Sequence, residues 1–240
     1  DSGSCKTSVV AQSGLEPELL AGQVLEDNAI IPTASINIWF ARNTAFVEAG
    51  GKLQKDRGLW AAVVRKVQPT RLRALLSSSA EAPKAALVCV SSEDLLQAGG
   101  DRHIALARSL RDRLDAICGT LAVKLPVYVL LTKSDRLTFF SEFARNLTND
   151  EANHVLGATL PIQTDQLSGV YSESATQKLQ IAFDNLVYSL CDRRPDLLSR
   201  ENDGDKLSGI YEFSRELRKR KTPDVQFLVE LCKPTQLGPA

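Results

Sequence analysis

The first seven residues, DSGSCKT, have the strongest chemical pattern in the chain. They are similar to the phosphate-binding loop GxxxxGK(S/T), in which backbone N–H groups surround the phosphates, the lysine contacts them and the last hydroxyl binds Mg²⁺. In this pattern Lys6 and Thr7 take the last two positions, and the loop consists of Ser2, Gly3, Ser4 and Cys5. The pattern predicts a nucleotide-binding loop, and a solvated turn that caps the following helix is an equally good interpretation.

Cys5 stands where such loops usually have a glycine, so a side chain lies where the backbone should approach phosphate. At the start of a helix and next to Lys6, exposed N–H groups and a cation both stabilise a thiolate. We therefore expect Cys5 to be the most reactive thiol of the chain, and Cys89, within an apolar run, to be inert.

An acidic residue, Glu48, follows a β-prone run and precedes two glycines. Nucleotide-binding α/β folds place an acid, usually Asp, at a strand end beside the phosphate loop, where it holds Mg²⁺ or its water. Glu48 and Thr7 are therefore candidate metal ligands. A strand that simply ends in a glycine turn is the more common explanation of such a segment.

A third pattern, Thr132-Lys133-Ser134-Asp135, directly follows another apolar run. It matches the (N/T)KxD signature of GTPase-type folds, in which the lysine stem lies along the base and the aspartate accepts two hydrogen bonds from a guanine edge. Lys133 and Asp135 are therefore candidate base-binding residues. A helix that starts near Arg136 and is capped by Ser134 or Asp135 is a comparable alternative.

The strands and helices that carry these residues can be predicted from the periodicity of apolar residues. Apolar runs at 85–90 and 127–131 have the length of strands that are buried on both faces of a parallel sheet. Between them, apolar residues recur every three or four positions over about 102–120, which predicts an amphipathic helix and hence a βαβ unit. The runs 36–40 and 45–48 predict an antiparallel hairpin.

Two regions of different character follow from this assignment. We expect residues 1–160 to be an α/β domain with a P-loop NTPase-like, mostly parallel sheet and flanking helices. After Pro161 only helical stripes remain, and Thr222-Pro223-Asp224 has the pattern of an N-cap, a first-turn proline and an acid. Residues 161–240 are therefore predicted to be a helical subdomain.

Composition limits the function further. The chain has 240 residues, 29 basic and 29 acidic, so no net charge favours general binding to nucleic acid or anionic lipid. Its longest apolar runs are far shorter than the roughly 20 residues that cross a bilayer. Five widely spaced cysteines without a CxxC pair are typical of free thiols in a reducing compartment. Because the chain begins at Asp1 and has no methionine, we expect it to be part of a longer protein.

Several segments together resemble the cytoplasmic domain of the IcmF/TssM family of type VI secretion. These segments are Trp39-Phe40, the strand into Glu48-Ala49-Gly50-Gly51, the run 87–96 and the run 125–135. In that family the matching stretches read like a W-W-F strand, an I-D-T-A-G-R-Y loop, a V-S-V-x-D-L-L strand end and an F-P-V-Y-V-L-x-T-K-x-D strand. The resemblance extends from Asp1 to about Pro161 and more faintly through the helices beyond.

The resemblance implies a nucleotide-binding domain on the cytoplasmic face of the bacterial inner membrane, attached through helices outside these residues. Its implied cofactor is Mg²⁺ with ATP or GTP, and its implied partners are inner-membrane and baseplate components of the secretion complex. Thr33, seven residues before Phe40, matches a switch-type threonine that could reach Mg²⁺, with a loop threonine after Pro32 as the alternative. A degenerate scaffold that binds no nucleotide and acts only as a docking module is the second function that we consider.

Overall fold

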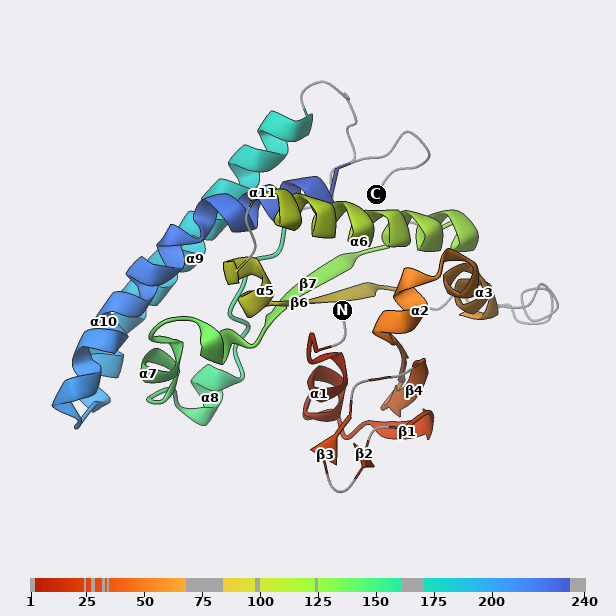
Figure 1. The fold of residues 1–240 in the computed structure, drawn as a ribbon. Helices are drawn as coiled ribbons and strands as arrows, with labels where there is room; N and C mark the ends of the chain where they lie inside the picture. The colour runs from red at the N-terminus through yellow and green to blue at the C-terminus, as the bar shows by residue number, and fades with distance from the viewer. Residues whose placement is uncertain are drawn as a thin grey trace. The chain divides into compact units, whose positions relative to one another are not determined.

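The computed structural model describes residues 3–23, 25–26, 29–31, 33, 35–67, 84–97, 100–123, 125–160 and 171–233 (Figure 1). The chain divides into two compact units that alternate along the sequence. The first unit consists of Asp1–Ser91, Asp112–Thr132 and Thr235–Ala240, and the second of Ser92–Arg111 and Lys133–Pro234. The predicted boundary near residue 160 adjoins residues 161–170, which lie outside the described residues, and it stays a prediction.

The first unit contains a three-stranded antiparallel sheet in the order β1-β4-β5. Its strands are β1 (Glu18–Ala21), β4 (Ile36–Ala41) and β5 (Thr44–Ala49). The last two strands pair from Ile36↔Ala49 to Ala41↔Thr44 around a two-residue turn, so the predicted hairpin is confirmed. A second antiparallel pair joins β2 (Leu25–Glu26) to β3 (Ala29–Ile30).

The two apolar runs form the parallel pair of the first unit. Strands β6 (Ala86–Ser91) and β7 (Val127–Thr132) pair in register from Ala86↔Val127 to Ser91↔Thr132. The predicted helix between them is α6 (Gly100–Leu121), whose first twelve residues, 100–111, belong to the second unit. Two parallel strands that are neighbours in a sheet need a long crossover connection of this kind. The predicted strand–helix–strand unit is therefore confirmed.

The wider fold prediction, a P-loop NTPase-like and mostly parallel sheet, is wrong. Within the described residues the strands form three separate small sheets, and only β6 and β7 are parallel. The physical reason is the short turn between β4 and β5, which permits only antiparallel pairing, and β4 then accepts β1 on its other edge. The two parallel strands are also not buried on both faces, because Leu87 is 43% and Tyr128 58% exposed.

The remaining elements of the first unit are helices. They are α1 (Lys6–Ala11), α2 (Gly51–Lys55) and α3 (Arg57–Val67). Val10 of α1 packs on the buried indole of Trp39, with Ala11, Leu19 and Phe46 around them. This small core fixes the helix that follows the phosphate-loop pattern onto the hairpin that carries Glu48. The sequence also predicts a short helix over 71–76, and these residues lie outside the described residues.

The second unit is helical in its described residues. It contains α5 (Ser92–Gln97), the start of α6, the 3₁₀ turn η1 (Ser134–Arg136), α7 (Phe140–Ala144), α8 (Asn149–Ala152), α9 (Tyr171–Arg200), α10 (Gly204–Lys219) and α11 (Lys221–Leu231). In Figure 1 the long helices α9 and α10 lie side by side. Together with α7 they form a core that consists of Phe143, Val187, Leu190, Leu197, Ile210, Phe213 and Leu217.

Two local features explain how α10 is positioned. A Cβ at Gly209 would lie 2.9 Å from Cγ of Glu142, so the glycine allows α7 to approach α10 closely. The helix α11 starts at Lys221, one residue before the predicted cap Thr222, because Arg220 has helical angles and joins α10 directly to α11.

Candidate functional site

The phosphate-loop pattern leads directly into α1. Gly3 has φ +95°, which favours glycine, and Cys5 has φ +53° at the residue that precedes the helix. Ser4 is 2% exposed, and Lys6 Nζ donates a hydrogen bond to its Oγ at 3.2 Å. Ser2 lies outside the described residues. The loop backbone is therefore tightly turned, and its lysine folds back toward the loop.

The loop is attached to the carboxyl ends of the parallel strands. Thr132 Oγ1, at the end of β7, lies 3.1 Å from the carbonyl oxygen of Ser4 and 3.3 Å from that of Val90, near the end of β6. Open α/β sheets bind ligands beyond the carboxyl ends of their strands. This contact could not be predicted from the sequence, in which Thr132 is only the first residue of the base-binding pattern.

The buried carboxylate of Glu48 brings three predicted site residues together. Thr7 Oγ1 donates to Glu48 Oε1 at 2.6 Å, Thr33 Oγ1 donates to the same oxygen, and the two hydroxyl oxygens lie 3.1 Å apart. Thr7, Thr33 and Glu48 are 5%, 8% and 6% exposed. Residues from three distant segments of the sequence therefore meet at one carboxylate oxygen.

The other oxygen of Glu48 is held by two residues of β4. Asn37 Nδ2 and Trp39 Nε1 each donate to Oε2 at 3.2 Å. Side chains alternate across a strand, so Asn37 and Trp39 face the same side, which is the buried side of β4. Sequence reasoning missed Asn37 as a site residue. Its signal was a lone polar residue at an inward position of an apolar strand.

Gly22 is shaped by this network. Its φ is +114°, and a Cβ there would lie 2.1 Å from Oδ1 of Asn37. The next residue, Gln23, donates its backbone N–H to that same oxygen at 3.3 Å. The glycine thus lets the chain pass close enough to Asn37 to fix the amide that binds Glu48.

The cluster has the donor chemistry of a hard cation site. It offers one carboxylate and two hydroxyls, and Mg²⁺ prefers oxygen ligands and commonly uses one carboxylate together with phosphate and water. Each hydroxyl that donates to Glu48 keeps a lone pair for a cation. In the described part of the chain, no group of three or more His, Cys, Asp or Glu residues is arranged to hold a metal by itself. The residues fit Mg²⁺ if a phosphate supplies further ligands.

The two cysteines of the prediction differ in their surroundings. Burial raises the pKa of the Cys89 thiol on β6, and nearby Lys6 partly opposes this shift. Cys89 is only partly buried, contrary to the expectation of a fully buried strand. Cys5 is also partly exposed, and its greater reactivity stays a prediction.

The predicted base-binding residues belong to the second unit, which is described by itself. Lys133 has φ +55° at the start of η1, and its Nζ lies 3.3 Å from Glu93 Oε2. Asp135 lies within η1, and its side chain is 67% exposed and pairs with Arg136 at 3.6 Å. Within the first unit the structure thus gathers Ser4, Lys6, Thr7, Thr33 and Glu48 in one place. In the second unit, Lys133 directly precedes η1 and Asp135 lies within it.

Comparison with known proteins shows the family to which this chain belongs. The sequence model of the family described as the IcmF-related N-terminal domain matches residues 54–240, which are most of the chain. The chain belongs to this family. The resemblance to the IcmF/TssM family is therefore confirmed. The match of the IcmF-related domain begins after Glu48, so the loop and the Glu48 cluster precede it.

The chain is also similar to one curated relative, the type VI secretion system component TssM1 of Pseudomonas aeruginosa strain PAO1. The two are 24% identical over 243 residues, which cover 97% of this IcmF-related chain and 21% of the relative. The chain therefore spans about a fifth of the relative's length. No solved structure matches the chain. Within the described residues, no helix is both long and apolar enough to cross a membrane.

Proposed function

We propose that this chain binds a nucleotide, ATP or GTP, at the loop of residues 2–7 and the Glu48 cluster. In this proposal it is the cytoplasmic portion of an inner-membrane subunit of a type VI secretion complex. The similarity to TssM1 and the family match support the secretion assignment. The convergence of Thr7 and Thr33 on one buried oxygen of Glu48 supports the nucleotide site.

Each residue has a distinct part in the proposed site. Lys6 contacts the phosphates, and the backbone N–H groups of Ser2, Gly3, Ser4 and Cys5 surround them. Thr7 and Glu48 hold Mg²⁺, which when bound neutralises phosphate charge, and Thr33 is its weaker third ligand. If the nucleotide is GTP, Asp135 accepts hydrogen bonds from the guanine and the stem of Lys133 lies along the base.

Nucleotide binding at the Glu48 cluster would change the conformation of the segments that this cluster joins. Thr7 is on α1, Thr33 precedes β4, and Glu48 is on β5. A cation that takes the lone pairs of the two hydroxyls changes the bonds that join these three segments. No glutamine follows Gly51 to orient a water, since Lys52 and Leu53 stand there, so hydrolysis would be slow at best. Bound nucleotide would therefore bias conformation, and through it contact with inner-membrane and baseplate components.

A docking module without nucleotide is the second candidate. The observation that favours it is the saturation of Glu48, whose two oxygens already accept four hydrogen bonds from side chains of the same chain. The presence of Cys5 in the loop, at the position where glycine is usual, also favours this candidate. In this case the Glu48 cluster is purely structural.

Calorimetric titration of the purified protein with Mg²⁺-ATP and Mg²⁺-GTP separates the two candidates. We expect Lys6→Ala to weaken binding by about 2 kcal/mol, roughly 30-fold, because a charge-assisted contact to phosphate is lost. Lys178→Ala, at an exposed position of α9, is the matched control and should change nothing. Asp135→Ala should weaken GTP alone if guanine is read.

The outcomes are distinct. No heat of binding for either nucleotide in the unmodified protein would reject nucleotide binding and leave the docking module. Equal binding by the Lys6→Ala and Lys178→Ala proteins would mean that nucleotide binds elsewhere.

A further inference from the structure

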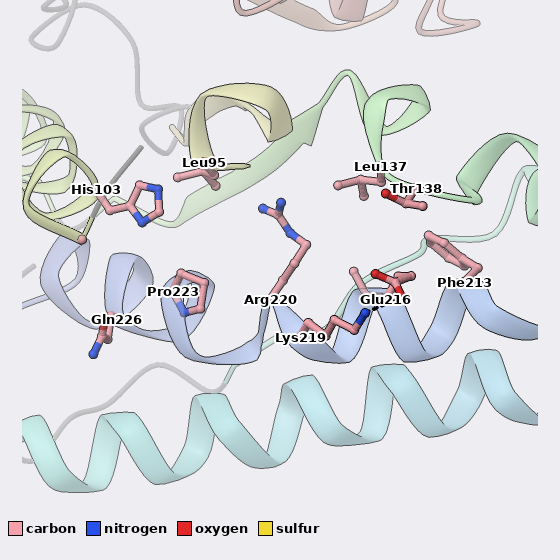
Figure 2. Close-up of a pocket in the computed structure, with 12 residues that line it drawn as sticks. Leu95, His103, Leu137, Thr138, Phe213, Glu216, Lys219, Arg220, Pro223 and Gln226 are labelled. Atoms are coloured by element: carbon pink, nitrogen blue, oxygen red, sulfur yellow. Dashed lines mark hydrogen bonds and ion pairs between the residues drawn. The ribbon is translucent and has the colours of Figure 1, made fainter. Parts of the chain in front are cut away.

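The second unit contains a cavity of about 380 Å³ that the proposed nucleotide site does not use (Figure 2). Its walls come from α5, the first turn of α6, the segment after η1, and the junction of α10 with α11. The lining includes a polar group, His103, Thr138, Glu216, Lys219, Arg220 and Gln226, and an apolar group, Leu95, Leu137, Phe213, Leu217 and Pro223. Its size is in the usual range for a site that binds a small organic molecule.

His103 is the unusual residue of this cavity. It is 6% exposed, and its Nε2 atom has no hydrogen-bond partner within the described residues. Buried polar atoms are almost always paired, so an unpaired ring nitrogen in a cavity wall points to a ligand. His103 is also in the first turn of the 22-residue helix α6, where free N–H groups and the helix dipole favour an anion.

Arg220 provides a second donor in the middle of the cavity. Its side chain is buried, and its Nε and Nη2 atoms bind the carboxylate of Asp224 at 3.1 and 2.9 Å. Its Nη1 atom has no partner in the described part of the chain, and Figure 2 shows the guanidinium between Leu95 and Leu137. An additional acceptor can therefore bind Arg220 without breaking its pair with Asp224.

The two carboxylates nearest the cavity, Glu216 and Asp224, are each paired with a cationic side chain. Glu216 pairs with Lys219 at 2.5 Å, and Asp224, which also lies close enough to His103 to interact electrostatically, pairs with Arg220. Asp101, in the same turn as His103, is exposed. No carboxylate of the lining is thus left to repel an anion.

The end of the cavity away from His103 has two large apolar side chains, which lie beside Thr138 and Glu216. In Figure 2, Leu137 and Phe213 lie beyond Arg220 on the side away from His103. A doubly charged, fully polar ion such as inorganic phosphate would leave this end empty. An acid with one negative charge and an apolar body would fill both ends.

We propose that this cavity binds a carboxylate attached to a branched apolar group. The carboxylate accepts hydrogen bonds from His103 Nε2 and Arg220 Nη1 near the start of α6, and the apolar group packs on Leu137 and Phe213. This chemistry occurs in small organic acids and in the C-terminal residue of a polypeptide that ends in leucine or a similar residue.

NMR of the histidine rings tests the proposal directly, because the chain has only two histidines, His103 and His154. Titration with N-acetyl-leucine should shift the His103 ring signals in a saturable way and leave those of exposed His154 unchanged. The neutral N-acetyl-leucinamide is the matched probe and should bind at least about 10-fold more weakly, since the charge-assisted contacts are lost. Equal affinity of acid and amide, or no shift of His103 with either, would overturn the proposal.

Variants and a longer probe complete the test. His103→Phe should weaken binding of the acid by about 10-fold or more, whereas His154→Phe should not. An unchanged affinity of the His103→Phe protein contradicts the proposal, and if that variant does not fold, the acid–amide comparison in the unmodified protein decides. A tripeptide that ends in leucine identifies the source. If the tripeptide binds as tightly as N-acetyl-leucine, the natural ligand is the C-terminus of a polypeptide. If the tripeptide does not bind, the natural ligand is a free organic acid.

Discussion

Two buried carboxylates, one in each unit, are stabilised in opposite ways. Asp224 is 4% exposed and is paired with the guanidinium of Arg220 by two hydrogen bonds. Glu48 is 6% exposed and is bound only by neutral groups, two hydroxyls, an amide and an indole, with no ion pair in the described residues. Asp224 therefore has a cationic partner within the chain, whereas the described residues around Glu48 supply only neutral donors.

The two environments suit the two carboxylates to different roles. Burial raises the pKa of the Asp224 carboxyl although Arg220 opposes the shift, so the pair is retained in spite of its desolvation. It joins the last residue before α11 to the first turn of that helix, which is a structural role. Glu48 joins three segments by bonds that a cation can rearrange, which suits a site that responds to a ligand.

Removal of one partner of the ion pair should give the largest effect. We expect Arg220→Ala to lower the free energy of unfolding by about 3–5 kcal/mol, because the carboxylate of Asp224 is then buried without its cation. The double variant Arg220→Leu with Asp224→Leu removes both charges and should recover most of this loss. Urea denaturation followed by circular dichroism measures both, and a double variant as unstable as the single one would mean that packing, not charge, is responsible.

The Glu48 cluster should respond more moderately, and in a cation-dependent way. Glu48→Gln should lower the free energy of unfolding by about 2 kcal/mol, because the amide nitrogen cannot accept the bonds of its former donors. Mg²⁺ added together with ATP or GTP should raise the melting temperature of the unmodified protein and not that of the variant, since the cation needs phosphate oxygens as further ligands. The same Mg²⁺ shift in both proteins would argue against Glu48 as a metal ligand.

Gly22 tests whether the Asn37 amide supports Glu48. Gly22→Ala should cost about 1–2 kcal/mol more than Gly14→Ala. Both glycines have positive φ, +114° and +69°, but only a Cβ at Gly22 meets Asn37, whereas at Gly14 nothing lies within 4 Å. Thermal unfolding of the two variants separates the clash from the backbone strain. Equal costs would mean that Asn37 moves aside freely.

The partly buried carboxylate of Glu151 should show the smallest of these effects, and it serves as a reference for the fully buried pair of Asp224 and Arg220. Its hydrogen bond with Arg200, at 2.6 Å, is the largest cause that lowers its pKa from 4.5 to about 2. Because the folded pKa is the lower one, its stabilising contribution is present above about pH 4.5 and is lost as the pH falls toward 2. As the pH falls from about 4.5 toward 2, the free energy of unfolding of the Glu151→Gln protein should therefore decrease less than that of the unmodified protein. Acid titration followed by circular dichroism measures this difference, and parallel curves of stability against pH for the two proteins would contradict it.

Local patterns in the sequence determined the elements and the chemistry of single segments. The β-prone runs 36–40 and 45–48, with a short connection between them, predicted a hairpin, and the period of 102–120 predicted a helix, since both depend on neighbouring residues alone. The loop of residues 2–7 and the acid at Glu48 were likewise visible as patterns.

The contacts between distant segments depend on the tertiary structure. An apolar run predicts a strand but does not name its neighbours, so the mostly parallel sheet was a wrong inference from β6 and β7 alone. The shared contact of Thr7 and Thr33 with Glu48, the fit of Gly22 against Asn37, and the unpaired nitrogen of His103 all depend on packing between residues far apart in the chain. Such contacts form because burial of polar groups forces them to find partners wherever the fold places one, and a linear pattern carries no record of that place.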